Sequence, residues 1–465
     1  MSPKHVRLEY ITLRDFKNVR YGTIPMPSII SKDRHSADMV GIYGQNGSGK
    51  TAVIEAFEFI DNMMTGLEIP TYAKDLINID SKASEIEVCY GIYDEELEEK
   101  TDEVHYTIRL SNLNGSVMIQ SEDMAIKERK EDGSGFKKIR SLVSFDGETL
   151  ELKPQMAFRK LLKSSKTLEL DVLVAIRMCQ KSTKSLLFSD DGILPLLDNV
   201  DDEYAVKLKE ILGTLHQYAI SSFVVISSRE FGVDSDFKLP ITYQCRKGEE
   251  STKLLMLDIG KPDIISREEC EDLKHMIVSM NMVLKTIVPH LTLGLYEAGE
   301  ELTRDGVKGV RVELVSYKNG RAIPIRYESE GIVKIISILN VLMSVYNDAD
   351  MCLVIDEFDA SIFEYLLGEL VQVFSTGAQG QMIFTSHNLR ILEMISKDSV
   401  VFSTANPENR YIRLSNIRDT NNLRDVYIRS LLLGGGKENI YEETDSYEIG
   451  RALRKAWRQD GKSEE

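Results

Sequence analysis

The chain contains 465 residues with an apolar fraction of 42%, which excludes the intrinsically disordered class and allows a large hydrophobic core. Its length predicts two or three domains, or one elaborated domain. The formal net charge of −17 argues against a broad basic surface that wraps nucleic acid, although a local basic groove is compatible with it. An acidic balance of this kind suits a soluble protein or one that meets a basic partner protein.

The five cysteines include no C-x-x-C pair, so we expect neither a zinc site nor a disulfide framework, and a reducing compartment fits best. The first residues carry no apolar signal segment. No stretch approaches the roughly 18 uninterrupted apolar residues that a membrane span needs. We therefore expect a cytoplasmic protein that spans no membrane.

The first hundred residues alternate between strand and helix patterns. Polar and apolar residues alternate at 7–13 and predict a strand, and the apolar run at 39–43 is typical of a buried strand. A helical period follows over 51–64. Residues 85–92 and 104–110 alternate again and predict an antiparallel pair of strands.

The middle of the chain has a different pattern. Residues 121–150 are polar, and the segment 127–135 is expected to form an exposed hairpin or loop. From 151 to about 285 the pattern is mostly helical, with helices expected at 156–162, 205–218 and 268–287. No heptad pattern lasts for several repeats, so a long coiled-coil arm is not expected.

The last third returns to strands and then alternates. Residues 290–327 have a strand pattern, and an amphipathic helix is expected at 331–346. Apolar strands at 352–355, 381–385 and 399–403 then alternate with helices. A β-α-β-α-β succession indicates a parallel sheet, so the fold class is α/β.

The most specific motif is a complete G-x-x-x-x-G-K-T loop between an expected strand and an expected helix. Its glycines let backbone N–H groups face phosphate oxygens, and the helix N-terminus adds partial positive charge. Lys50 would bind the β- and γ-phosphates, and Thr51 would offer its hydroxyl to Mg²⁺. A chance glycine turn is the alternative, and the flanking strand and helix argue against it. The predicted nucleotide-binding residues here are Gly44, Gln45, Asn46, Gly47, Ser48, Gly49, Lys50 and Thr51.

Two adjacent carboxylates end the apolar strand near residue 355. Asp356 would hold the Mg²⁺ shell, and Glu357 would polarise an attacking water. An ordinary core strand with acidic surface residues after it is the alternative. The phosphate loop earlier in the chain favours the functional interpretation.

His387 follows the next apolar strand. A lone histidine is more often structural, but this one lies where a parallel strand ends, on the side where α/β sheets form their sites. It is therefore predicted to contact the γ-phosphate and orient the water. Ser329 precedes the helix expected at 331–346, where it would form an N-cap and an anion site, or a plain N-cap without a ligand.

Together these motifs resemble the ABC-type ATPase heads of the RecF, SMC and OLD group. The phosphate-loop sequence is typical of that group, and so is the opening segment Ile11–Asn18. Residues Ser329 to Gly331 resemble a degenerate form of the Leu-Ser-Gly-Gly signature. Asp359 begins a segment that resembles the D-loop, and His387 resembles the switch histidine.

The resemblance implies an ATPase head with a mixed or parallel P-loop sheet, an antiparallel lobe and a largely helical insertion. It also implies that ATP and Mg²⁺ are bound at an interface between two copies, with Ser329, Gly331 and Asp359 acting beside the phosphate loop. Self-association as a dimer or a larger assembly follows. The expected parts are an N-terminal half-head at 1–120, a helical insertion at 121–289, a C-terminal half-head at 290–422 and a helical tail at 423–465.

The chain also departs from this group. A Q-loop glutamine cannot be placed by spacing, and the segment after His387 has no acidic cluster typical of the Toprim domain in OLD nucleases. Among compact members, the chain resembles anti-phage ATPases: the AriA subunit of PARIS, AbiL-type abortive-infection ATPases and the ATPase of Septu. That resemblance implies a separately encoded effector protein as partner.

Two alternatives stay open at this point. A RecF-like DNA-repair clamp would need a basic groove, so nucleic-acid binding is left undecided. An OLD-like nuclease-associated ATPase would need a metal site within 121–289. Acidic residues occur in that region, but they cluster with turn residues and have the pattern of a solvated surface. They are Asp190, Asp191, Asp201, Asp202 and Glu203.

Overall fold

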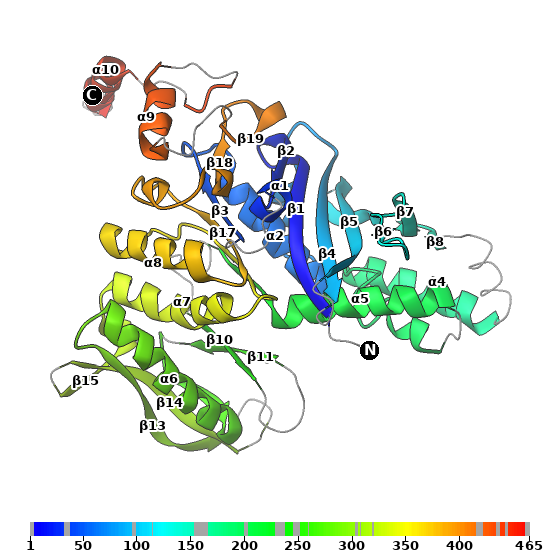
Figure 1. Ribbon diagram of the computed structural model, residues 1–465, viewed down its shortest axis with the longest axis horizontal. Coiled ribbons are helices and arrows are strands. Elements are labelled where there is room, and N and C mark those ends of the chain that lie inside the picture. The colour runs from blue at the N-terminus through cyan, green and yellow to red at the C-terminus, as the bar shows by residue number, and fades with distance from the viewer. Residues whose placement is uncertain are drawn as a thin grey trace.

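The computed structural model of the chain places its helices around two large sheets and a smaller one (Figure 1). The structure describes residues 4–31, 38–94, 99–113, 115–152, 166–199, 203–227, 238–244, 252–258, 260–302, 306, 308–318, 320–414, 422–433, 438–441 and 445–460.

The central sheet has six strands in the described part of the chain, and five of them are parallel. The short edge strand β19 is antiparallel to its neighbour. The parallel sheet predicted from the last third of the sequence is therefore confirmed. Across the sheet the order is β19 (Tyr411–Ile412), β18 (Val400–Ser403), β3 (Asp38–Tyr43), β17 (Gln381–Thr385), β16 (Cys352–Ile355) and β9 (Phe223–Ile226).

The strands of the central sheet are buried on both faces. Val354 and Ile383 pack into a core shared with helix α2 (Lys50–Met64), whereas Leu353 and Met382 pack into a second core. That second core contains α7 (Glu330–Asn347) and α8 (Glu364–Gly377). Alternate residues of a strand face opposite sides, so continuous apolar runs were required here.

A second, antiparallel sheet forms a lobe beside the central sheet. We call it the lobe sheet. It has seven strands among the described residues, and two neighbouring ones correspond to the antiparallel pair predicted at 85–92 and 104–110. In spatial order they are β2 (Val19–Pro25), β1 (Lys4–Phe16), β4 (Ala83–Asp94), β5 (Glu99–Leu113), β6 (Ser116–Glu128), β7 (Arg140–Phe145) and β8 (Leu150–Leu152).

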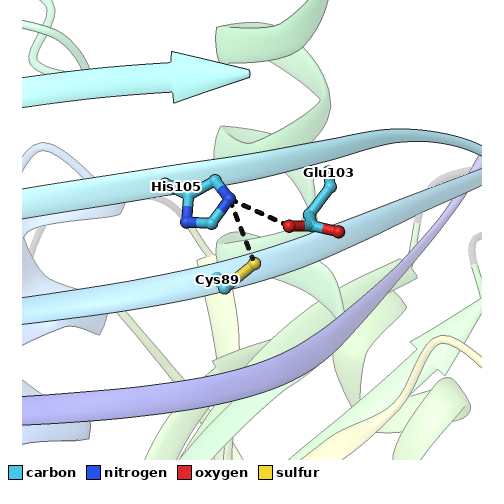
Figure 2. Close-up of side chains that lie close together, drawn as sticks. All are labelled: Cys89, Glu103 and His105. Carbon is cyan, nitrogen blue, oxygen red and sulfur yellow. Dashed lines mark hydrogen bonds and ion pairs between the residues drawn. The ribbon is translucent and has the colours of Figure 1, made fainter. Parts of the chain in front are cut away.

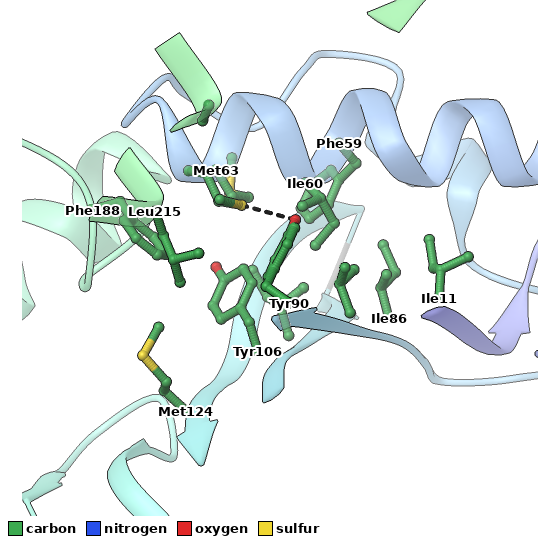
Figure 3. Close-up of a cluster of buried hydrophobic side chains, with 14 of the residues drawn as sticks. Ile11, Phe59, Ile60, Met63, Ile86, Tyr90, Tyr106, Met124, Phe188 and Leu215 are labelled. Atoms are coloured by element: carbon green, nitrogen blue, oxygen red, sulfur yellow. Dashed lines mark hydrogen bonds between the residues drawn. The ribbon is translucent and has the colours of Figure 1, made fainter. Parts of the chain in front are cut away.

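One face of the lobe sheet packs on α2 and α5 (Glu203–Ser221). Figure 3 shows Tyr90 and Tyr106 rising from neighbouring strands toward Ile60 and Met63 of α2. The Tyr90 hydroxyl donates to the sulfur of Met64 at 3.2 Å, so its polar atom is satisfied inside the core.

A smaller antiparallel sheet lies against α6 (Arg267–Ile287) at one end of the molecule (Figure 1). The helix begins with a capping box, in which the Glu269 amide donates to Ser266 Oγ at 3.1 Å and the Ser266 amide donates to Glu269 Oε2 at 2.7 Å. Its strands are β12 (Asp263–Ser266), β13 (Thr292–Leu302), β14 (Lys308–Lys318) and β15 (Arg321–Pro324), beside the separate pair β10 (Lys238–Gln244) and β11 (Thr252–Asp258).

The remaining helices are short or peripheral. They are α1 (Pro27–Ser31), α4 (Lys166–Ser182), α9 (Leu423–Leu433) and α10 (Ser446–Asp460), with 3-10 turns at Ala73–Leu76, Pro195–Asn199, Ile325–Tyr327, Ile391–Glu393, Lys397–Ser399 and Pro407–Asn409. The helix expected at 156–162 lies outside the described residues.

Strand β6 runs across the domain boundary predicted at residue 120 and joins the lobe sheet. The segment after 120 is also less helical than expected, since β7 and β8 extend the lobe sheet and β9 is an edge strand of the central sheet. Met124 and Ile126 of β6 are buried, whereas Asp123, Ala125 and Lys127 beside them are partly exposed. The sequence predicted an exposed hairpin or loop here, and β6 and β7 do pair as an antiparallel hairpin, although their strands are longer than the pattern indicated. The domain division stays a prediction.

One described helix, α7, is long and apolar enough to cross a membrane by length and composition alone. Most of it is buried inside the protein, and its apolar residues Ile336 and Leu339 belong to the second core. Its hydrophobicity is therefore accounted for by packing between the central sheet and α6.

The two large sheets are joined by one buried amide. The side chain of Gln381, at the start of β17, donates to the carbonyl of Leu8 at 2.9 Å and accepts from the Leu8 amide at 2.7 Å. Its Nε2 also donates to Asp38 Oδ2 at 2.7 Å. Gln381 is 1% exposed, and its side-chain amide bonds to the backbone of β1 as a neighbouring strand would, which links β1 to the central sheet.

We expect Gln381→Leu to destabilise the protein by about 2–4 kcal/mol, because a buried amide, carbonyl and carboxylate each lose a hydrogen bond. Chemical denaturation measures this change. The matched control is Gln379→Leu, two residues earlier at an exposed position, which should change stability by less than about 0.5 kcal/mol. Equal effects at the two positions would contradict the role of the amide.

Candidate functional site

Three chain segments meet at one edge of the central sheet, because β3, β17 and β16 are parallel and adjacent. Ile42 pairs with Thr385, and Phe384 pairs with Ile355. The next residues along each strand are the phosphate loop, the pair Asp356 and Glu357, and the segment with His387. The carboxyl ends of parallel strands form the sites of α/β sheets.

The phosphate loop has the backbone that its glycines predict. Gly47 and Gly49 have φ of 78° and 92°, in the left-handed region that favours glycine. Helix α2 begins directly afterwards at Lys50. The Lys50 ammonium donates to the carbonyls of Gly44 at 2.9 Å and Gln45 at 3.0 Å, so it lies across the loop.

Lys50 is buried, and its surroundings are acidic. Burial lowers the pKa of its ammonium, and the carboxylates of Asp356, Glu357 and Asp359 oppose that shift. These three carboxylates therefore lie within electrostatic reach of the loop. A cation with several carboxylates beside it at a helix N-terminus is suited to hold a phosphate chain together with a divalent cation.

Thr385 organises the two carboxylates at the end of β16. Its hydroxyl donates to Asp356 Oδ1 and accepts from the Glu357 amide at 2.8 Å. Glu357 has φ of 48°, which is unusual for a residue other than glycine and turns its side chain out of the strand direction. Asp356 is 1% exposed, whereas Glu357 is exposed.

Lys334 of α7 supports the same turn. Its ammonium donates to the Glu357 carbonyl at 3.3 Å and is buried beside Asp356 and Asp359. Burial lowers the pKa of Lys334, and the neighbouring carboxylates oppose this shift. The sequence analysis missed Lys334, although a lysine inside the apolar run Ile332–Ile336 was a signal.

His387 belongs to the same group of side chains. Its backbone amide donates to Asp359 Oδ2 at 3.1 Å, which ties the histidine to the segment after Glu357. Partial burial lowers the pKa of the imidazole, Lys50 lowers it further, and Asp359 and Glu357 partly oppose both effects. The imidazole is therefore neutral at neutral pH and has one N–H to donate.

Ser329 and Gly331 lie at the start of α7. Ser329 is exposed and is the N-cap residue of α7, but its side chain makes no capping hydrogen bond within the described residues. Gly331 lies directly against the segment that begins at Asp359, because a Cβ at residue 331 would collide with the carbonyl oxygen of Ser361. The start of α7 and the segment after Asp359 therefore pack as one unit.

Three further residues support the phosphate loop and carried no sequence signal. The Tyr411 hydroxyl donates to the Gly49 carbonyl at 2.7 Å, and Ser403 Oγ contacts Ser48 Oγ. Arg410 donates to the carbonyls of Thr404 and Asn18. These contacts join residues that are far apart in the chain, so only the fold could identify them.

The oxygen donors at the site fit the ligands predicted for it. Thr51 lies in the first turn of α2, and Asp356 is buried with one carboxylate oxygen fixed by Thr385. Hydroxyl and carboxylate oxygens are ligands that Mg²⁺ prefers. An added Cβ at Gly47 would meet no atom within 4 Å, so the outer side of the loop is open to a ligand.

The model of the AAA ATPase domain family (AAA_15) matches residues 7–392. This range includes the phosphate loop, the carboxylate pair and His387. No curated protein matches the chain. The family match supports ATP binding at the loop, and it covers β3, β9, β16 and β17 of the central sheet.

Several solved structures are similar in overall arrangement. An SMC head domain of Pyrococcus furiosus with ScpA is 12% identical, with 88% of this chain and 96% of that chain covered and a TM-score of 0.41. The SMC head domain of Thermotoga maritima is 14% identical (88% and 99% covered, TM-score 0.37). The recombination mediator RecF bound to ATP is 12% identical (83% and 94% covered, TM-score 0.34). Likenesses of this size identify no activity.

We expect Lys334→Met to lower ATP turnover roughly tenfold, because loss of one hydrogen bond to the Glu357 turn is worth about 1.4 kcal/mol. Nucleotide affinity should change less than about twofold, since the contacts of Lys50 are untouched. Steady-state kinetics and calorimetry measure the two effects. Lys334→Arg, which keeps the charge, should recover part of the turnover. Unchanged turnover in Lys334→Met would exclude this positioning role.

Proposed function

We propose that this chain, which belongs to the AAA ATPase domain family, hydrolyses ATP with Mg²⁺ and uses the reaction as a switch. The observation that carries the proposal is the convergence of Lys50, Asp356, Glu357 and His387 at one edge of the central sheet. A phosphate loop without these neighbours would account for ATP binding but not for ATP hydrolysis. The carboxylates and a neutral histidine beside it supply what hydrolysis also needs.

Each residue has a distinct role in this proposal. Lys50 and the loop amides bind the phosphates, and Thr51 with Asp356 would hold Mg²⁺, which would offset phosphate charge. Glu357 accepts a proton from the attacking water. His387 donates its N–H to a γ-phosphate oxygen and keeps the water in line, because its lowered pKa leaves it uncharged.

We infer that a second copy completes the site. Ser329 is exposed at the start of α7, so this helix N-terminus is accessible to another molecule. In a dimer, Ser329 and the Gly331 amide of one copy would bind the γ-phosphate held by the other. ADP lacks that phosphate, so hydrolysis would loosen the assembly.

The contacts of α7 support a link between the two halves of such a shared site. Gly331 packs on Ser361, and Lys334 bonds to the Glu357 carbonyl. A change at the exposed end of α7 would therefore reach the catalytic turn of the same copy through direct contacts. This arrangement favours a switch over a simple nucleotide-binding module.

We further propose that the switch controls a separately encoded effector in a bacterial anti-phage system. The support is the resemblance to compact, arm-less ATPases of that kind, and the net charge of −17 suits a basic protein partner better than nucleic acid. A RecF-like DNA clamp is the second candidate, and it requires a basic groove across the dimer.

The nuclease-associated alternative has less support. Within the described ranges, one group of three or more His, Cys, Asp or Glu side chains has metal-ligand spacing, and it lies in the lobe sheet. Asp201 and Asp202 lie outside those ranges, while Asp190 is exposed and Asp191 pairs with Lys184.

We expect Lys50→Ala to weaken ATP binding roughly 10- to 100-fold, because a charge-assisted contact to phosphate is lost. Isothermal titration calorimetry measures the affinity. The matched control is Lys74→Ala, at an exposed position on a 3-10 turn, which should bind ATP normally. Wild-type affinity in folded Lys50→Ala would remove the loop from the site.

A double variant tests the shared site. Glu357→Gln should slow hydrolysis roughly 100-fold and accumulate the ATP-bound assembly, because the base is lost while phosphate contacts remain. Adding Ser329→Arg should prevent assembly without lowering ATP affinity of the single head. Light scattering with and without ATP measures the mass. An ATP-dependent mass increase that survives Ser329→Arg would contradict the shared site.

A further inference from the structure

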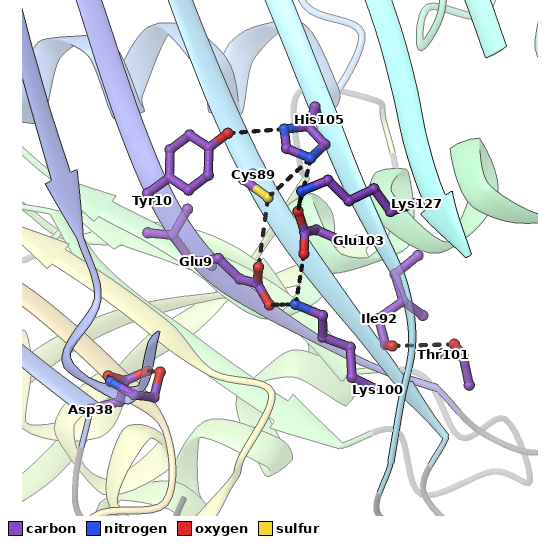
Figure 4. A network of polar contacts seen from close by, with 12 residues as sticks. Glu9, Tyr10, Asp38, Cys89, Ile92, Lys100, Thr101, Glu103, His105 and Lys127 are labelled. Atoms are coloured by element: carbon purple, nitrogen blue, oxygen red, sulfur yellow. Dashed lines mark hydrogen bonds and ion pairs between the residues drawn. The ribbon is translucent and has the colours of Figure 1, made fainter. Parts of the chain in front are cut away.

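A second polar cluster lies on the outer face of the lobe sheet (Figure 4). Cys89 of β4 pairs directly with His105 of β5, and Glu103 lies two residues before His105 on the same face. Val104 lies between Glu103 and His105, and it pairs with Tyr90, the residue after Cys89. Both side chains belong to the core on the opposite face of the sheet. This cluster takes no part in the ATP site proposed above.

The backbone is shaped to bring a fourth side chain to the cluster. The register between β1 and β4 shifts between Leu8 and Tyr10, so Glu9 is the extra residue of a β-bulge. Its carboxylate lies over β4 at Gly91, where an added Cβ would be 2.6 Å from Glu9 Oε1. Glycine at 91 thus leaves the space that the carboxylate occupies.

The donor atoms have the spacing of a metal site. His105 Nε2 is 3.0 Å from Glu103 Oε1 and 4.0 Å from Cys89 Sγ (Figure 2). Cys89 Sγ is 3.7 Å from Glu9 Oε2. Ligand atoms around a tetrahedral Zn²⁺ are roughly 3.3–3.8 Å apart, given the usual metal–ligand bond lengths. The ligand atoms of Cys89, Glu103 and His105 lie within 4.8 Å of one another. Glu9 lies beside this group through its contact with Cys89, and a side-chain movement would bring its carboxylate to the same centre.

The histidine is oriented as metal ligands are. Tyr10 donates its hydroxyl to Glu87 at 2.8 Å, so the Tyr10 oxygen is left to accept from His105 Nδ1 at 2.9 Å. This hydrogen bond places Nε2 toward Cys89 and Glu103. A second hydrogen bond on the far nitrogen fixes the ring in most protein metal sites.

Two lysines bind the carboxylates of this cluster, and they differ in their partners and in their exposure to solvent. Lys100 bonds to Glu9 Oε1 and to Glu103 Oε2, which leaves the other oxygen of each carboxylate facing the cluster. Lys127 bonds to Glu103 Oε1, which is the oxygen nearest His105. The Lys127 side chain is 33% exposed against 13% for Lys100, so Lys127 can swing into solvent.

We propose that Glu9, Cys89, Glu103 and His105 bind one divalent transition-metal cation of the Zn²⁺ class, which replaces Lys127 at Glu103. The mixed sulfur, nitrogen and oxygen donors favour such a cation over Mg²⁺ or Ca²⁺. Binding releases the thiol proton of Cys89 and any proton on His105 Nε2. Lys100 then stays as the partner of the two outer carboxylate oxygens, and the cation links β1, β4 and β5.

The cluster was not expected from the sequence, because its ligands come from three strands and no C-x-x-C pair marks them. Without a cation, Lys127 bonds to Glu103 and balances its charge. The same cluster therefore has two stable arrangements, one with Lys127 and one with a cation.

The test is titration of the full chain with Co²⁺, without nucleotide. A tetrahedral site with a thiolate gives strong visible bands and a near-ultraviolet sulfur-to-cobalt charge-transfer band. We expect one equivalent to bind with that band, and Cys89→Ser to abolish it. Cys270→Ser, which removes another buried cysteine on α6, should keep the band. Co²⁺ at Thr51 and Asp356 has no sulfur ligand and gives no such band.

The lysine variant makes the proposal falsifiable even if Cys89→Ser folds poorly. Lys127→Met should tighten Co²⁺ binding about tenfold, because one competing charge-assisted hydrogen bond is removed. Zn²⁺ should displace Co²⁺ with loss of colour. Absence of the charge-transfer band in both the wild type and folded Lys127→Met would overturn the proposal. So would a band that persists in Cys89→Ser, or an affinity unaffected by Lys127→Met.

Discussion

The position of β17 between β3 and β16 is the constraint on which the site depends. Parallel pairing in this order ends three strands at one edge, and the register sets Thr385 beside Asp356. Every residue assigned to hydrolysis follows one of these strands. Gln381 at the other end of β17 binds β1, so the strand that aligns the site also anchors the lobe sheet.

Much of the site could be predicted from the sequence, because its chemistry needs particular residues directly after strands. Lys50, Asp356, Glu357 and His387 do lie together, and the parallel sheet was evident from buried strands alternating with helices. Lys334, Ser403 and Tyr411 were not predicted. Their roles come from contacts between distant segments, and a serine, a tyrosine or one buried lysine has no local pattern that identifies its partner.

The lobe was predicted less completely than the central sheet. A strand with one solvent-facing side carries many polar residues, so the sequence indicated an exposed hairpin or loop without the long strands β6 and β7, and the helical content after residue 120 was overestimated. The cluster around Cys89 and His105 was missed for a related reason. Cross-strand pairing and a bulge at Glu9 created it, and neither register nor bulge could be derived from the alternation of β4 and β5 alone.

The strand order also governs how the protein can be made. β3 carries the phosphate loop, yet both of its neighbours, β17 and β18, come more than 300 residues later. On the ribosome, β3 would therefore wait without sheet partners while most of the chain is synthesised, and the lobe sheet could pair strand by strand meanwhile. The sheet around β3 could form only after β17 and β18 have emerged, and Tyr411, which supports the phosphate loop, emerges later still. A chain truncated before that point would expose an apolar strand and depend on chaperones.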